Sequence, residues 1–230
     1  MEFPAPTIIH ADADLLVVDK PAGILSIPDG YDRAVPYLGG VLEPSYGRLW
    51  VVHRLDKETS GVMVFARNER SHKALSTQFS SYQVSKTYHV LIDGNPDWEE
   101  NTIEVPLRTN VGRRNRTAVD IANGKDAVTH FRVLERFPRH ALLAAYPKTG
   151  RTHQIRVHIY DLGYSILSDP LYGLGNLSPF IGRLALHALS LSIWHPTTGE
   201  LITFEAQYPK DFNEGVHQLR LIASASQDGG

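Results

Sequence analysis

Two polar segments carry the side chains best suited to chemistry, HRLDKETSG at 53–61 and GRTHQIRVH at 150–158. A carboxylate at Asp56 held by the guanidinium of Arg151 would stay ionised and oriented. With no thiol available, such a carboxylate can act as a nucleophile or stabilise a sugar-like cation. Glu58 is the neighbouring second acid, so glycoside or nucleoside hydrolysis with Asp56 and Glu58 is one candidate reaction.

The sequence lacks the motifs of several common enzyme classes. It contains no GxxxxGK[ST], GxGxxG, GxSxG or HExxH pattern. It also contains no cysteine, which excludes disulfides, thiolate nucleophiles, iron–sulfur clusters and cysteine zinc sites. The eleven histidines are more typical of structural or surface positions than of a metal site. We therefore expect neither a cofactor nor a metal ion.

Charge is unevenly distributed along the 230 residues, although the formal net charge is only −2. Residues 105–156 carry 11 basic and 3 acidic side chains, with a focus at Arg113, Arg114 and Arg116. A basic cluster of this kind can bind phosphates. These three arginines are candidate contacts to a nucleic acid, and a solvated loop is the alternative.

Hydrophobic patterning predicts the elements that must position these segments. Apolar residues at helical spacing predict a helix over 68–82 capped by Asn68, and another over 149–162 capped by Thr149. Residues 29–47 are rich in Gly, Pro and Tyr and are expected to form a loop with one helical turn. A short helix is expected from Pro209. The expected strands lie within 8–19, 49–52, 62–66, 86–92, 127–137, 140–146, 184–194 and 201–206.

This order of elements favours the α+β class, with a mixed, mainly antiparallel β-sheet, a few flanking helices and a cleft across the sheet. We expect a single domain over residues 1–230, with a core of about 8–212 and a C-terminal tail at 213–230. No apolar run reaches the ~18 residues of a membrane helix, and the N-terminus lacks a signal-peptide pattern. No long apolar seam is evident either, so we expect a cytoplasmic monomer without a membrane partner.

At its two polar segments the sequence closely resembles the RluA family of pseudouridine synthases. HRLDKETSG looks like the catalytic motif of that family. Further matching blocks occur in family order, so the resemblance spans roughly residues 8 to 206: DLLVVDKPAG at 14–23, SKTY at 85–88, GRTHQIRVH at 150–158, DPLYG at 169–173 and LALHA at 184–188. The resemblance implies the pseudouridine synthase catalytic fold and an enzyme that isomerises uridines of ribosomal or transfer RNA without a cofactor.

The resemblance also assigns roles to individual residues. It makes Asp56 the catalytic carboxylate and Arg151 its partner. It makes Tyr88 the aromatic residue that stacks on the target base and assists the late proton removal. Arg54 matches the residue that enters the RNA helix where the flipped base leaves, and Ile155 matches an apolar wall beside the uracil.

The remaining substrate contacts expected are His53, in the same motif as Asp56, and the basic residues Arg113, Arg114 and Arg116. The last three would position RNA phosphates without reading sequence.

Two departures from the family are visible. Many relatives carry an S4 domain before the catalytic part, and we expect none here, because the resemblance begins near residue 8 and only about seven residues precede it. Ser168 stands where a glycine often precedes the DPLYG block, which puts the local turn geometry in question.

An RNA-binding or chaperone protein that has lost catalysis is a further alternative, although Asp56, Tyr88 and Arg151 are all present. Attack of Asp56 on the sugar, attack on the base, and a glycal route all remain open.

Overall fold

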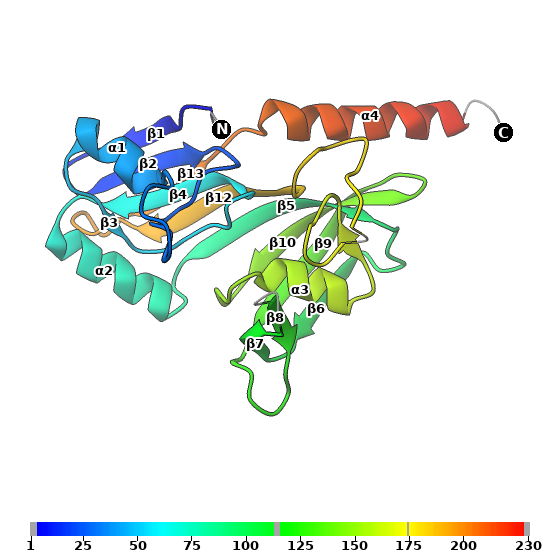
Figure 1. The fold of residues 1–230 in the computed structure, drawn as a ribbon, viewed down its shortest axis with the longest axis horizontal. Helices are drawn as coiled ribbons and strands as arrows, with labels where there is room; N and C mark the ends of the chain where they lie inside the picture. The colour runs from blue at the N-terminus through cyan, green and yellow to red at the C-terminus, as the bar shows by residue number, and fades with distance from the viewer. Residues whose placement is uncertain (1–3, 113–115, 174, 228–230) are drawn as a thin grey trace. The chain divides into compact units, whose positions relative to one another are not determined.

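The computed structural model describes residues 4–112, 116–173 and 175–227 (Figure 1). The chain divides into two compact units. The first unit comprises Met1–Lys86 and His187–Gln207, and the second comprises Thr87–Leu186 and Tyr208–Gly230. That the chain acts as one single domain stays a prediction.

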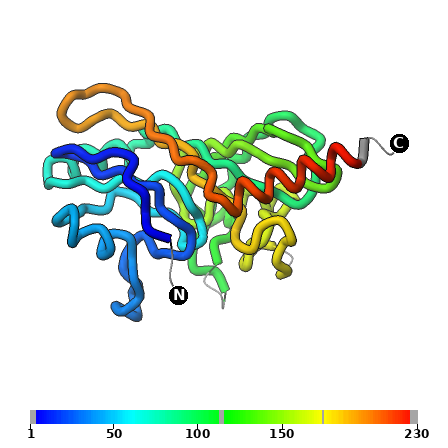
Figure 2. Tube along the Cα trace, turned by 90° about the horizontal axis from the view of Figure 1, so that it is seen from above, coloured from blue at the N-terminus to red at the C-terminus, as the bar shows by residue number. Residues whose placement is uncertain are grey.

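The first unit is built on a sheet with the strand order β1-β2-β4-β12, in which β3 lies beside β4 and β13 beside β12. β4 and β12 run parallel, and the other pairs are antiparallel. In Figure 2 the hairpin of β12 and β13 is the long orange loop. The elements are β1 (Thr7–Ala11), β2 (Leu15–Lys20), α1 (Leu38–Tyr46), β3 (Trp50–Val51), β4 (Ser60–Ala66), α2 (Glu69–Ser80), β12 (Leu186–Trp194) and β13 (Leu201–Glu205).

β4 is the central strand of this unit, because every one of its residues is buried. Its apolar side chains pack with those of β2, α2, β12 and β13 in one core that includes Leu15, Val64, Leu75 and Ile193. Continuous apolar runs of β-branched residues are typical of strands buried on both faces. The sequence pattern that predicts this strand therefore reports its burial directly.

The two helices of the first unit differ in how well the sequence predicts them. α2 begins after Asn68, whose side chain accepts a hydrogen bond from the Ser71 N–H at 2.9 Å, so the predicted N-cap is confirmed. α1 is a nine-residue helix where one helical turn was expected. Its first turn contains two glycines, and a Cβ at Gly40 would come within 2.9 Å of the Tyr37 ring. These residues carry little helix propensity, so packing against Tyr37 replaces it.

The second unit contains strands in the order β5-β10-β9-β6, all antiparallel, with β11 beside β5 and a separate two-stranded ribbon of β7 and β8. The helices α3 and α4 complete the described part of this unit. The elements are β5 (Ser85–Asp93), β6 (Glu100–Glu104), β7 (Leu107–Val111), β8 (Arg116–Val119), β9 (Val128–Arg136), β10 (His140–Pro147), α3 (Gln154–Asp161), β11 (Ser165–Ile166) and α4 (Lys210–Gln227).

The C-terminal helix α4 is longer and more deeply packed than expected. It has 18 residues, whereas the sequence predicted a short helix leading into a tail. Phe212, Val216 and Leu219 are at most 1% exposed and belong to the main core of the second unit. Their spacing of three and four residues places them on one face of the helix. The segment 213–219 is therefore core rather than tail.

α3 begins later than the sequence predicted. The expected helix started at Thr149, but the observed one starts at Gln154, after His153 in the left-handed region at φ +54°. The predicted stop at Gly163 agrees with its φ of +84°. With four helices in the part of the chain that the structure describes and mainly antiparallel pairing, the α+β class is confirmed. The expected cleft across the sheet stays a prediction.

Candidate active site

The loop that carries Asp56 joins β3 to β4 in the first unit and is anchored by a buried lysine. Lys20 is fully buried, and its ammonium donates hydrogen bonds to three backbone oxygens, those of Pro21, Ile24 and Lys57, at 2.8, 2.9 and 3.0 Å. A buried ammonium is tolerated only when its protons find acceptors. Lys20 therefore ties the KPAG segment to the residue that follows Asp56.

Two further contacts fix the same loop on the other side of Asp56. The hydroxyl of Ser26 donates to the Leu55 oxygen at 2.7 Å and accepts from the Leu55 N–H at 3.0 Å. The Gly23 N–H donates to the Lys57 oxygen at 2.9 Å. Asp56 is half-buried and lies between two backbone positions that are both held by residues 20–26. The exposed Arg54 lies on the same loop.

His53 serves the framework of this loop. Its Nε2 accepts a hydrogen bond from the Val64 N–H at 3.0 Å, and its ring stacks on Phe79 at 4.6 Å between centroids. Burial, together with the positive charge of Lys86, lowers the pKa of His53 to about 3. The imidazole is therefore neutral, with its proton on Nδ1. The prediction that His53 also contacts substrate stays a prediction.

The end of the HRLDKETSG segment enters β4 against β12. The Ser60 hydroxyl contacts His187 Nδ1 at 2.9 Å, and His187 Nε2 lies 3.3 Å from the Ala206 oxygen. Because the carbonyl can only accept, His187 carries its proton on Nε2 and Ser60 donates. Gly61 has φ +117°, and a Cβ there would lie 2.1 Å from the Ala188 oxygen. Only glycine fits at this position, where β4 pairs with β12.

The segment before α3, in the second unit, holds Arg151 through a buried glutamine. The Gln154 amide donates to Val128 O at 3.0 Å and to Thr129 Oγ1 at 2.9 Å. Its Oε1 accepts from the Thr149 hydroxyl at 2.6 Å and from the Arg151 N–H at 3.0 Å. Gln154 thus fixes the backbone from which Arg151 projects. The Thr149 hydroxyl bonds the Gln154 side chain and does not form the predicted N-cap.

The predicted site residues are distributed over both units. Arg151 donates from Nε to the Asp126 oxygen at 2.9 Å. Tyr88 is half-buried on β5 and packs against the core of the second unit. Ile155 is 6% exposed and belongs to that same core. That Tyr88 and Arg151 meet Asp56, and that Ile155 also forms a wall of a uracil site, stay predictions.

Arg116 is engaged with its own unit. It donates to the Leu171 oxygen, and its guanidinium lies 4.6 Å from the centre of the Tyr172 ring. Arg113 and Arg114 lie outside the described residues. Several other cations of the basic segment are paired with acids: Arg108 with Asp120, Arg132 with Glu100, Arg136 with Glu99 and Arg156 with Asp169. These ion pairs neutralise part of the positive charge that residues 105–156 carry.

A buried polar cluster connects the DPLYG segment to α3 and β8. Arg156 forms two parallel hydrogen bonds to Asp169, both of 2.7 Å. Burial acts to raise the pKa of Asp169, but the Arg156 contacts hold it below its usual value. The Tyr172 hydroxyl accepts from the Thr117 N–H at 2.9 Å and contacts His153 Nδ1 at 3.0 Å. The sequence predicted no role for these residues, although the DPLYG block contains Asp169 and Tyr172.

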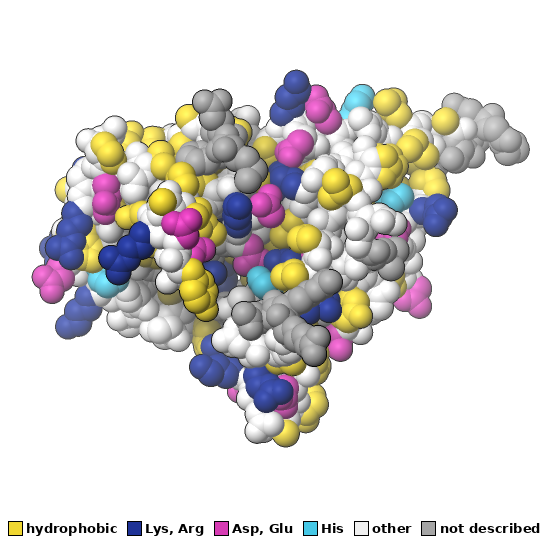
Figure 3. All heavy atoms as spheres, in the orientation of Figure 1, with side chains coloured by type: hydrophobic (Ala, Val, Ile, Leu, Met, Phe, Trp, Pro, Cys, Tyr) yellow, Lys and Arg dark blue, Asp and Glu magenta, His cyan; other side chains and the backbone are white. Residues whose placement is uncertain are grey.

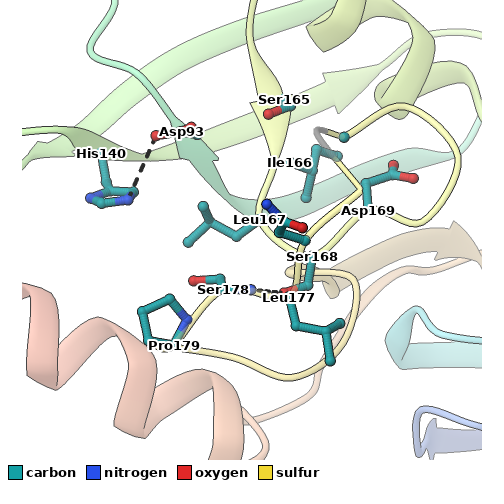
Figure 4. Close-up of a pocket in the computed structure, with 12 residues that line it drawn as sticks. Asp93, His140, Ser165, Ile166, Leu167, Ser168, Asp169, Leu177, Ser178 and Pro179 are labelled. Atoms are coloured by element: carbon teal, nitrogen blue, oxygen red, sulfur yellow. Dashed lines mark hydrogen bonds and ion pairs between the residues drawn. The ribbon is translucent and has the colours of Figure 1, made fainter.

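Ser168 adopts a turn conformation that glycine would also adopt. Its φ is +56°, the left-handed region that glycine adopts most readily. Its hydroxyl donates to the Ile181 oxygen at 2.6 Å and accepts from the Ser178 N–H at 2.7 Å. Figure 4 shows Ser168 and Ser178 facing each other beside a pocket of about 170 Å³. The serine therefore keeps the glycine-like turn and fastens it with two hydrogen bonds.

Comparison with known proteins identifies the family of this chain. The family model for RNA pseudouridylate synthase matches residues 14–160. The chain is 36% identical over 226 residues to ribosomal large subunit pseudouridine synthase D of Zymomonas mobilis, covering 89% of this chain and 69% of the relative.

The chain belongs to the RNA pseudouridylate synthase family. It is also 36% identical over 201 residues to the dual-specificity RNA pseudouridine synthase RluA of Haemophilus influenzae, covering 87% of this chain and 92% of that one. The structure of human RNA pseudouridylate synthase domain containing 4 superposes with a TM-score of 0.76 at 27% identity, over 93% of both chains.

Pseudouridine synthases are isomerases that act on uridines in RNA, so the predicted enzyme class and RNA substrate are confirmed. In this pseudouridine synthase, the blocks that carried the resemblance coincide with the anchoring contacts described above. Within residues 4–112, 116–173 and 175–227, no helix has the length and apolar character needed to cross a membrane.

Proposed function

We propose that this pseudouridine synthase modifies ribosomal or transfer RNA and uses Asp56 as its catalytic carboxylate. The observation that carries the proposal is the rigid loop around Asp56 within a family-matched sequence, held by Lys20, Ser26 and Gly23. A side chain that must approach one atom of a flipped nucleotide gains from a fixed backbone. The relatives named for the ribosomal large subunit and for dual specificity support the choice of RNA.

The reaction conserves every atom of the nucleotide. The bond between N1 of uracil and C1′ of ribose breaks, and a bond between C5 and C1′ forms. The proton on C5 leaves, and N1 gains a proton. Asp56 would stabilise or capture the group released in the first step, Arg151 would keep Asp56 ionised, and Tyr88 would stack on the base during its rotation.

Binding would require the target uridine to leave its stack, at a cost of a few kcal/mol. Arg54 is exposed on the Asp56 loop and can occupy the space that the base leaves. Ile155 would contribute apolar surface beside the uracil, and Arg113, Arg114 and Arg116 would contact phosphates. We further propose a monomer that needs no metal ion and works in the cytoplasm, where these RNAs are made and used in bacteria.

The test is tritium release from RNA labelled at C5 of uridine. The wild type should release tritium from ribosomal or transfer RNA, and Asp56→Asn should release none while keeping most of its RNA affinity. Asp56→Asn working as fast as wild type would contradict the proposal. Release of free uracil in place of pseudouridine would indicate hydrolysis.

A further inference from the structure

An open hollow in the first unit combines an exposed aromatic ring with two cations. Its volume is about 530 Å³, and it lies along α2 beside the end of β12. Small-molecule sites typically measure about 300–1,000 Å³. Figure 3 shows Lys and Arg side chains on the surface of the region where α2 lies. Its lining includes Arg70, Lys73, Ala74, Thr77, Gln83 and Trp194.

The tryptophan at this hollow is fixed by its backbone and open at its ring. The buried amide of Gln78 donates to the Trp194 oxygen at 2.7 Å and accepts from the Trp194 N–H at 2.9 Å. The two bonds fasten the last residue of β12 to α2. Trp194 is nevertheless 47% exposed. A partly exposed aromatic residue on a fixed backbone suits a stacking platform, because little backbone freedom is lost when a ligand binds.

Two cations, Arg70 and Lys73, line the same hollow as Trp194. Arg70 and Lys73 are three residues apart on α2 and therefore project from the same side of the helix. Arg70 contacts Asp14 at 3.3 Å and the Thr197 hydroxyl, which orient its guanidinium while the side chain stays 70% exposed. Lys73 is exposed. Thr77 and Gln83 add a hydroxyl and an amide to the lining.

We propose that this hollow binds a nucleotide of a single-stranded segment of the RNA substrate, away from the uridine that reacts. The base would stack on Trp194, and the phosphate would contact Lys73 and Arg70. Aromatic rings next to cations bind single strands without regard to sequence, because every base has a flat face and every nucleotide a phosphate. The inference rests on RNA being the substrate and adds a second contact region to the proposed function.

The first experiment measures binding of 5′-fluorescein-labelled hepta-adenylate RNA by fluorescence anisotropy. This probe has no uridine, so it reports on stacking and phosphate contacts apart from isomerisation. Trp194→Ala should weaken binding about tenfold, and Trp194→Phe should stay within about threefold of wild type. Lys73→Gln should lower the slope of log affinity against log salt by about 0.7.

Leu201→Ala is the matched control, because Leu201 pairs with Trp194 across the β12–β13 hairpin and is 57% exposed, but does not line the hollow. Its affinity for hepta-adenylate should equal that of wild type. An unchanged affinity in Trp194→Ala overturns the proposal and favours a protein partner at this surface. An equal loss in Leu201→Ala and Trp194→Ala also overturns it, since the cause would then be the hairpin itself.

A second measurement tests stacking directly. The chain has three tryptophans, so Trp50→Phe combined with Trp98→Phe leaves Trp194 as the sole indole emitter. Hepta-adenylate should quench this emission, and inorganic polyphosphate, which has charge but no bases, should not. Equal quenching by both probes, or by neither, contradicts stacking.

The two proposals can fail separately. Trp194→Ala should raise KM for RNA in the tritium-release assay and leave kcat unchanged. Asp56→Asn should bind hepta-adenylate like wild type, because Asp56 does not line the hollow. If Asp56→Asn remains active, the catalytic proposal fails and the binding site stands. If Trp194→Ala binds hepta-adenylate normally, the reverse holds.

Discussion

Ser26 and Leu55 exchange two hydrogen bonds through a single hydroxyl, immediately before the carboxylate at position 56. The Ser26 oxygen is 2.7 Å from the Leu55 oxygen and 3.0 Å from the Leu55 nitrogen, and Ser26 is 3% exposed. Residues 26 and 55 come from separate segments of the first unit. The pair therefore couples the position of the loop that carries Asp56 to the segment of residues 20–26.

Replacement of Ser26 tests this coupling. Ser26→Ala leaves a buried N–H and a buried carbonyl without their partner, so we expect a loss of about 1–3 kcal/mol in the free energy of unfolding. Activity should fall several-fold beyond the effect of stability, because the Asp56 backbone loses an anchor. Urea denaturation and tritium release measure the two effects. Ser80→Ala, at an exposed position of α2, is the control, and an equal response from both variants would contradict the coupling.

The turn at Ser168 makes a prediction about backbone conformation. Ser168→Gly loses the hydrogen bonds to Ile181 and Ser178 but suits φ +56°. Ser168→Ala loses the same bonds and keeps the left-handed penalty of roughly 1–2 kcal/mol. The expected order of stability is wild type, then glycine, then alanine, measured by urea denaturation. An alanine variant as stable as the glycine variant would show that the left-handed turn does not matter here.

The buried ion pair of the second unit should respond far more strongly than an exposed one. Arg156 and Asp169 have side-chain exposures of 6% and 0%. Asp169→Asn leaves the buried guanidinium without its counter-charge and should cost about 3–5 kcal/mol. Glu135→Gln breaks the pair with Arg220, which is 54% exposed, and should cost at most about 1 kcal/mol. Thermal or urea unfolding compares them, and similar losses would contradict the assignment.

Acid should destabilise the protein through its buried histidines. The pKa values of His53, His89 and His158 are lowered by burial to about 3, 4 and 4. The unfolded chain takes up these protons near pH 6.5, before the folded chain does. The free energy of unfolding is therefore lost as the pH falls from about 6.5 to 4.

Burial has the opposite consequence at Asp19. It raises the pKa of Asp19 to about 6, so the folded state binds the extra proton between about pH 4 and 6 and partly offsets the histidines.

His53→Gln should reduce the slope of unfolding free energy against pH by up to about 1.4 kcal/mol per pH unit. Urea titrations at pH 4.5, 5.5 and 6.5 measure it. A His53→Gln slope equal to that of wild type would contradict the account.

Most strands could be predicted from the sequence because strands that are buried in the sheet consist of runs of apolar residues. β4 is buried throughout, and its run of apolar residues follows from that. Asn68 signalled the start of α2 because a cap is a local interaction between near neighbours. The start of α3 was placed five residues early, since Thr149 resembles a cap. Its hydroxyl instead bonds Gln154, in a network that reaches across to β9.

The site was predicted only as far as its motifs reach. HRLDKETSG identifies Asp56, but nothing local indicates that Lys20 and Ser26 hold the same loop, because those contacts join residues 37 and 29 positions apart. Trp194 and Lys73 were missed for the same reason. Each is an ordinary residue of its own element, and only the packing of β12 on α2 brings them to one hollow.

The central claim is that Asp56 carries out the isomerisation. Its most direct test is the single-turnover rate of tritium release from C5-labelled RNA for wild type, Asp56→Asn and Glu58→Gln, the last being a neighbouring acid in the same loop. We predict release by wild type and Glu58→Gln at rates within about tenfold of each other, and no detectable release by Asp56→Asn although it still binds RNA. Measurable turnover in Asp56→Asn, or an equal loss in Glu58→Gln, would contradict the account.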